Sequence, residues 1–212
     1  MKIERMMAGV YGANCFIVSD EETKTCFIID PGGDADDIEK YLVENDLTPK
    51  FILLTHGHGD HIAGIPILRR TYDIPVWIHE EEDRLLQDPQ LNMSLFMPIT
   101  PVGFRADRLL KDKETISEGH FVIKVHHSPG HTRGSCCYKM EGHLFTGDTL
   151  FYRSIGRTDL VTGSPEDMEH TLEYVLYPMG DKLIVHSGHG QDSTMGDEKE
   201  HNLFFKKYRK RG

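Results

Sequence analysis

The segment Thr55–His61 (Thr-His-Gly-His-Gly-Asp-His) constrains this chain more than any other feature. In an extended loop, His56, His58 and Asp60 stand at alternate positions, so their side chains can project to one side while His61 points elsewhere. The two intervening glycines widen the choice of backbone angles, so the loop can wrap closely around an ion. On a helix, His56 and His58 would diverge. We therefore expect a metal-binding loop that can face two metal positions.

Candidate ligands also follow other predicted strands. The loop above begins after the apolar run Phe51–Leu54, which is typical of a strand buried on both faces. Loops at the carboxyl ends of strands are common ligand sites in α/β proteins. Three further candidates occupy such positions, namely His131, Asp148 and His189. Imidazole and carboxylate groups without thiolate suit Zn²⁺, Fe²⁺ or Mn²⁺, and this set is large enough for a two-metal site.

Strands and helices alternate along much of the chain. Apolar patterning and turn residues predict strands at 14–19, 25–29, 51–54, 76–79, 121–126, 135–139, 143–146 and 182–185. Helices are predicted at about 34–45, 62–72, from Ser164 to before Pro178, and at 196–210. Each half has strands followed by a helix, which predicts two packed β-sheets flanked by helices in one domain spanning residues 1–212.

The segment from Glu80 to Thr115 is less regular than its surroundings, because Pro89, Pro98 and Pro101 interrupt it. Within it, Met93–Met97 fits either packed core or an adaptable wall beside a pocket, and we favour the core.

Composition limits which classes of partner and which cellular compartment we expect. With 24 basic against 34 acidic residues, the net charge of -10 gives no attraction for nucleic acid or for anionic membrane surfaces. The first residues lack the apolar run of a secretory signal, and no apolar stretch approaches the roughly 20 residues that span a bilayer. The four cysteines contain no C-x-x-C pair. We expect a cytoplasmic protein with reduced thiols.

Five short motifs occur in order along the chain: Thr55–His61, Pro129–Thr132 (Pro-Gly-His-Thr), Thr146–Phe151 (Thr-Gly-Asp-Thr-Leu-Phe), Gly156–Asp159 (Gly-Arg-Thr-Asp) and Gly188–Gly190 (Gly-His-Gly). In this combination the chain resembles the metallo-β-lactamase-fold superfamily. Within it, the chain is most similar to short, bacterial-type glyoxalase II-like proteins, that is, to hydroxyacylglutathione hydrolase and its relatives. The resemblance covers nearly the whole chain.

The resemblance implies an α/β fold of αββα type, a four-layer sandwich. It also implies two divalent metal ions, for which we expect zinc, with iron or manganese as alternatives. The first ion would be bound by His56, His58 and His131. The second would be bound by Asp60, His61 and His189, and Asp148 would bridge both.

The expected reaction is hydrolysis of a small-molecule thioester such as S-lactoylglutathione by a metal-bound hydroxide. Two divalent ions sharing a water lower its pKa and polarise the carbonyl under attack, and a thiolate is a stable leaving group. We assign catalytic roles to Asp60, as ligand and orienter, and to Asp148, as bridge. Arg157 and Asp159 either support the site or contact substrate, with a plain surface ion pair as the alternative.

Other reactions remain open. An iron-dependent persulfide dioxygenase of the same fold resembles the chain at Gly156–Asp159 and would consume oxygen with glutathione persulfide. True β-lactamases of the fold typically carry cysteine where Asp148 stands, which disfavours antibiotic hydrolysis. The acidic composition disfavours a nuclease. A non-catalytic scaffold is disfavoured because structural sites are usually closed four-ligand cages.

Overall fold

The computed structural model describes residues 1–208, which divide into two compact units at Leu110 and Lys111. Unit 1 contains a six-stranded sheet in the order β1-β2-β3-β4-β5-β6. Its strands are β1 (Lys2–Ala8), β2 (Ala13–Ser19), β3 (Thr25–Ile29), β4 (Thr48–Leu53), β5 (Val76–His79) and β6 (Arg108–Leu110). The first three strands pair antiparallel, whereas β3 to β6 run parallel. The carboxyl ends of β3 to β6 therefore meet at one edge of the sheet.

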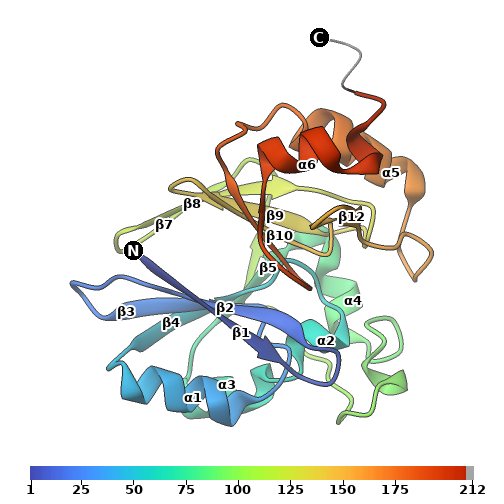
Figure 1. The fold of residues 1–212 in the computed structure, drawn as a ribbon. Helices are drawn as coiled ribbons and strands as arrows, with labels where there is room; N and C mark the ends of the chain where they lie inside the picture. Colours follow the sequence, from blue (N-terminus) through green and yellow to red (C-terminus); the bar gives the residue numbers. More distant parts are fainter. Residues whose placement is uncertain (209–212) are drawn as a thin grey trace. The chain divides into compact units, whose positions relative to one another are not determined.

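Helices cover one face of this sheet (Figure 1). The helical segments of unit 1 are α1 (Ala35–Glu44), α2 (Gly59–Ile62), α3 (Ile65–Tyr72), α4 (Asp83–Gln87) and the 3₁₀ turns η1 (Glu80–Glu82) and η2 (Ser94–Phe96). Leu42 on α1 and Leu68 on α3 belong to one buried cluster with Ile28 and Ile52 of the sheet. The apolar stripe of each helix thus buries the side chains that point to this face.

The opposite face of the same strands is also apolar. Phe27, Phe51 and Trp77 stack in a row across β3, β4 and β5, with ring centroids 4.8 Å and 4.0 Å apart. All three are buried. The sequence predicted a strand buried on both faces at 51–54, and the structure confirms it because consecutive residues of β4 enter opposite clusters.

Unit 2 contains the second six-stranded sheet, in the order β14-β13-β10-β9-β8-β7. Its strands are β7 (Thr115–Glu118), β8 (Phe121–His127), β9 (Cys136–Met140), β10 (His143–Gly147), β13 (Ile184–Ser187) and β14 (Ser193–Thr194). Strand β9 pairs antiparallel with both β8 and β10, and β10 pairs parallel with β13. Strands β8, β10 and β13 consequently end at the same edge of the sheet.

One face of the second sheet is likewise covered by helices (Figure 1). They are α5 (Pro165–His170), the π-helical segment η3 (Thr171–Leu176), α6 (Met195–His201) and the 3₁₀ turn η4 (Leu203–Phe205), and a small hairpin joins β11 (Leu150–Phe151) to β12 (Ser154–Ile155). The predicted start at Ser164 is confirmed, since its Oγ accepts a hydrogen bond from the Asp167 amide at 3.1 Å. No helix within residues 1–208 is long and apolar enough to cross a membrane.

Two helix predictions need correction. The helix predicted at 62–72 is two helices, because Gly64 donates its amide to Pro31 at 2.9 Å and interrupts the ladder. Its first turn starts at Gly59, so Asp60 and His61 lie on α2 and not in the loop. The helix predicted at 196–210 ends at His201, where the Asn202 side chain accepts the Phe204 amide at 3.0 Å. Positions 209 and 210 of that prediction lie outside the described residues.

The predicted strands are confirmed with shifts of at most three residues at their ends. The strand predicted at 51–54 is Thr48–Leu53, and the one predicted at 182–185 is Ile184–Ser187. Sequence patterning missed β1, whose side chains are mostly exposed or half-buried, and the short β6, β7, β11, β12 and β14. In Met93–Met97, Ser94 is buried while Leu95 and Phe96 are 51% and 62% exposed, so the expectation of core is wrong for those two. The prediction of a single domain stays a prediction.

A pH dependence of stability follows from His126 on β8. Its Nε2 atom is buried and makes no hydrogen bond among residues 1–208. Desolvation, with Lys139 and Lys124 adding to it, lowers the pKa of His126 below its usual value. The folded state therefore binds fewer protons than the unfolded state, and stability falls as the pH drops below the unfolded pKa of about 6.5.

We expect His126→Gln to lose less thermal stability than the parent protein when the pH is lowered from 7.5 to 5.5. His120→Gln, at an exposed histidine in the turn between β7 and β8, is the control. Melting temperatures by scanning fluorimetry across this range provide the measurement. Equal pH slopes for the parent and His126→Gln would contradict the assignment.

Candidate metal centre

The loop after β4 gathers three imidazole rings in unit 1. His56 and His58 lie in the loop, and His61 lies on the first turn of α2. The ring centroid of His56 is 4.9 Å from that of His58 and 4.3 Å from that of His61. All three histidines are buried, which is unusual for such polar side chains unless they have partners. The Asp60 carboxylate lies beside them, with Oδ2 3.9 Å from His61 Nε2.

Close backbone packing shapes this loop. A Cβ atom on Gly59 would lie 2.8 Å from both Ser94 Cα and Met97 Sδ, so only glycine fits. The Gly59 amide also donates to Asn92 O at 2.8 Å. The irregular segment around Met93 therefore serves as the support of the histidine loop, a role that the sequence did not reveal.

Asp30, at the carboxyl end of β3, orients two of these histidines through hydrogen bonds, one of them by way of Thr55. Its Oδ1 accepts the Thr55 amide at 2.8 Å, and its Oδ2 accepts the Thr55 hydroxyl at 2.5 Å. The same Oδ2 accepts from His61 Nδ1 at 3.2 Å, and the Thr55 hydroxyl oxygen in turn lies 3.1 Å from His56 Nδ1. Both rings are thus anchored through Nδ1, and each directs Nε2 to the opposite side, as metal-binding histidines do.

Sequence reasoning missed Asp30 and also Glu82, a fully buried carboxylate that accepts the Gly57 amide at 3.0 Å. Asp30 directly follows the predicted strand at 25–29. The available signal was its place at the end of a strand next to β4, but that neighbourhood is known only once the sheet order is known.

We expect Asp30→Asn to weaken metal binding about 10- to 100-fold, the usual cost of removing an outer partner of a ligand. The single oxygen of an amide cannot accept all three hydrogen bonds that the two carboxylate oxygens accept here. Metal titration against a chelating dye measures the loss. Asp46→Asn is the matched control, because Asp46 shares the left-handed backbone (φ 57° against 49°) but is exposed. Equal affinities of the two variants would refute the supporting role.

Unit 2 brings its three predicted ligands together around one carboxylate oxygen. His131, Asp148 and His189 follow β8, β10 and β13, which end at the same edge of the sheet. Asp148 Oδ2 lies 3.5 Å from His131 Nε2 and 3.7 Å from His189 Nε2. One carboxylate oxygen this close to two imidazole nitrogens is compatible with a ligand shared by two ions.

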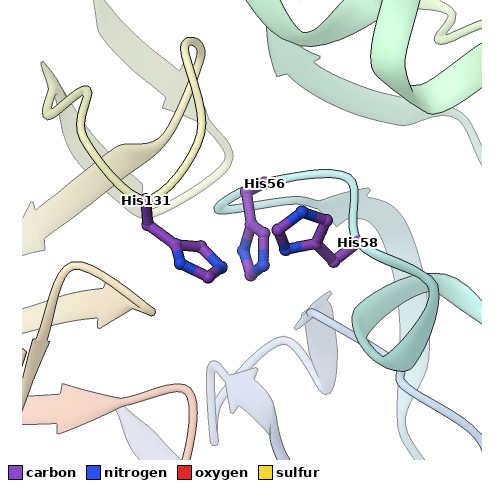
Figure 2. A group of neighbouring side chains, drawn as sticks. All are labelled: His56, His58 and His131. Atoms are coloured by element: carbon purple, nitrogen blue, oxygen red, sulfur yellow. The ribbon is translucent and has the colours of Figure 1, made fainter. Parts of the chain in front are cut away.

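His131 is anchored in the same way as His56 and His61. Its Nδ1–H donates to the Arg157 carbonyl at 2.8 Å. Figure 2 shows the ring of His131 on its loop, and the rings of His56 and His58 on the loop after β4. The donor sets of both units therefore fit divalent ions. His56, His61 and His131 are anchored through Nδ1, and the Asp60 and Asp148 carboxylates are nearly buried.

The side chains of Arg157 and Asp159 pair with each other, whereas the backbone of Arg157 contacts the site. Their side chains form a two-bond ion pair of 2.7 Å and 2.8 Å that is 62% and 68% exposed. The Arg157 guanidinium lowers the pKa of Asp159 to about 2, mainly through this hydrogen bond. Within unit 2 the side chains match the predicted alternative of a surface ion pair, while the Arg157 backbone carbonyl supports His131.

An apolar pocket of about 750 Å³ lies in unit 2, lined by residues of β12, α5 and η4. Ile155, Met168 and Leu172 line it, together with Phe204 and the basic Lys206. The basic residues Lys206 and Lys207 therefore border this pocket.

Comparison with known proteins places these features in a family. Residues 8–190 match the model of the metallo-beta-lactamase superfamily. The hydroxyacylglutathione hydrolase GloC of Haemophilus influenzae is 34% identical, over 96% of this chain and 98% of its own. The match spans both units and contains all the predicted ligand positions.

Two solved structures are also similar. The crystal structure of BLEG-1, described as a B3 metallo-beta-lactamase, is 38% identical with a TM-score of 0.91, covering 97% of this chain and 100% of its own. TTHA1623, solved in a di-iron-bound form, is 28% identical with a TM-score of 0.84, covering 95% and 99%. These similarities confirm the predicted fold class.

Proposed function

Since this chain belongs to the metallo-beta-lactamase superfamily and is a metal-dependent hydrolase, we propose that it hydrolyses a thioester of the hydroxyacylglutathione type. The observation that carries the proposal is the Asp148 oxygen placed between His131 and His189, which suits a carboxylate shared by two ions. The similarity to GloC supports the substrate class.

In this proposal the seven predicted ligands divide into two sets. His56, His58 and His131 bind one ion, Asp60, His61 and His189 bind the other, and Asp148 belongs to both. Zinc and iron both suit imidazole and carboxylate donors, and the di-iron form of TTHA1623 keeps iron among the candidates for this chain.

The protein's own groups prepare the site for this chemistry. When bound, the ions supply a water of lowered pKa and polarise the thioester carbonyl. Asp148 and Asp60 supply negative charge that offsets the divalent cations. Asp30 and the Arg157 carbonyl fix the rings of His61 and His131, so these two ligands are oriented before substrate arrives.

A cysteine nucleophile does not compete with this mechanism. All four cysteines are free and buried. Burial raises the pKa of Cys137 to about 11 and that of Cys26 to about 12, so their thiolates are scarce at neutral pH.

The test is a substrate panel for protein loaded separately with zinc and with iron. We expect the release of glutathione from S-lactoylglutathione, followed with a thiol reagent, and its loss in Asp148→Ala. Intact thioester after incubation with both metal forms would overturn the proposal. Oxygen consumption with glutathione persulfide in the iron form would instead identify a persulfide dioxygenase.

β-Lactam hydrolysis is the second candidate, because BLEG-1 is 38% identical over 97% of this chain. A chromogenic cephalosporin in the same panel tests it. A catalytic efficiency for the β-lactam above that for the thioester would favour this second function.

A further inference from the structure

The loop from Ser187 to Asp192, which carries His189, is tied down at its start. The Ser187 hydroxyl donates to the His189 carbonyl at 2.7 Å, with the Gln191 carbonyl at 3.4 Å. The Gly188 amide donates to the Gly147 carbonyl at 2.8 Å, next to Asp148. The Ser187 side chain thus closes the turn, and the backbone amide of Gly188 joins the loop to β10.

The end of the same loop is tied to the sheet by a chain of three side chains. His186 Nδ1 lies 2.9 Å from Asp192 Oδ2, and His186 Nε2 lies 2.9 Å from His143 Nδ1. A carboxylate only accepts hydrogen bonds, so His186 donates to Asp192 through Nδ1–H, and its Nε2 shares a second hydrogen bond with His143 Nδ1. The two bonds link His143, His186 and Asp192 into one continuous chain.

Packing fixes the central ring of this chain. The His186 ring stacks on Phe145 with centroids 4.9 Å apart and on His143 with centroids 5.1 Å apart. Its side chain is only 7% exposed, and it stands on β13, in register with Phe145 of β10. Asp192, 39% exposed at the end of the loop, is therefore tethered to a rigid part of the sheet.

His189 depends on its loop for its position. Its side chain is 28% exposed, compared with 4% for His131, so packing restrains it less. We propose that His186, Asp192, His143 and Ser187 are positioning residues that preset His189 for the second ion. This inference rests on the proposed function, in which His189 is a ligand.

The test measures metal binding directly. Cobalt titrations of the metal-free protein, followed by visible absorption, resolve the two sites. We expect His186→Phe, which keeps an aromatic ring but removes both hydrogen bonds, to weaken the second site about 10- to 100-fold and to leave the first unchanged. Asp192→Ala, at a more exposed position, should do the same. His201→Phe is the matched control, because His201 forms an exposed pair with Asp197 at 3.1 Å.

The variant His189→Ala distinguishes a failure of the proposed ligand set from a failure of the positioning inference. If it still binds two ions with the parent affinities, the ligand set of the proposed function is wrong. If it loses the second ion while His186→Phe and Asp192→Ala keep the parent affinity, the positioning inference is overturned. Should His186→Phe unfold by circular dichroism, Asp192→Ala alone decides the inference.

Discussion

Replacing Asp148 with alanine is expected to lower the hydrolytic rate by at least about 100-fold, the low end of the cost of removing one electrostatic group from an active site. Its Oδ2 lies 3.5 Å from His131 Nε2 and 3.7 Å from His189 Nε2, so the substitution removes the one anionic group that both imidazoles share here. Both ions should bind more weakly, because each loses an anionic ligand. Thioester turnover and metal content after dialysis are the measurements.

Asp181→Ala is the control for Asp148→Ala. Asp181 is 72% exposed and pairs with Lys199 at 2.7 Å, and exposed ion pairs contribute only about 0–1 kcal/mol. Asp148→Asn adds a second test, since it keeps the shape and removes the charge. An Asp148→Ala protein with full activity would refute the bridging role.

Replacing Gly156 with alanine is expected to have the second large effect. The new Cβ atom would lie 1.7 Å from the Asp148 carbonyl oxygen and 3.1 Å from His131 Nδ1. The backbone has to move, and overpacking of this kind costs about 1–3 kcal/mol. That loss lowers the melting temperature by about 2–12 °C in a chain of this size. Because Arg157 moves with Gly156, metal affinity should fall as well.

Gly180→Ala provides the matched comparison for Gly156→Ala. Among residues 1–208, no atom beyond the two chain neighbours lies within 4 Å of a Cβ built on Gly180, and its backbone angles are open to alanine. It should leave the melting temperature and metal binding nearly unchanged. Equal behaviour of the two alanine variants would show that the close approach at Gly156 is not tight in solution.

The helical corrections have a common physical cause. Apolar periodicity predicted α1 and most strands because each buries a regular stripe or face, and the capping residue Ser164 predicted the start of α5. It missed the break at Gly64 and the early end of α6 at His201, because the groups that interrupt these helices are distant or act through a side chain. Pro31 accepts the Gly64 amide, and Asn202 caps the following turn.

The groups that orient the ligands could not be predicted from local patterns either, because they are distant in the sequence. Asp30 precedes Thr55 by 25 residues, and the Arg157 carbonyl follows His131 by 26. A backbone carbonyl carries no residue-specific signal at all. Such partners become visible only when the sheet order brings strand ends to one edge.

The sequence by itself determined the candidate ligands, because histidines and aspartates spaced by glycines at strand ends have few other uses. It also determined the alternation of strands and helices, which local burial patterns dictate. Only the tertiary structure decided what holds each ligand: Asp30 behind His61, the Arg157 carbonyl behind His131, and the His143–His186–Asp192 chain behind the His189 loop. These contacts join residues that are far apart along the chain or that meet only across paired strands, so no local pattern encodes them.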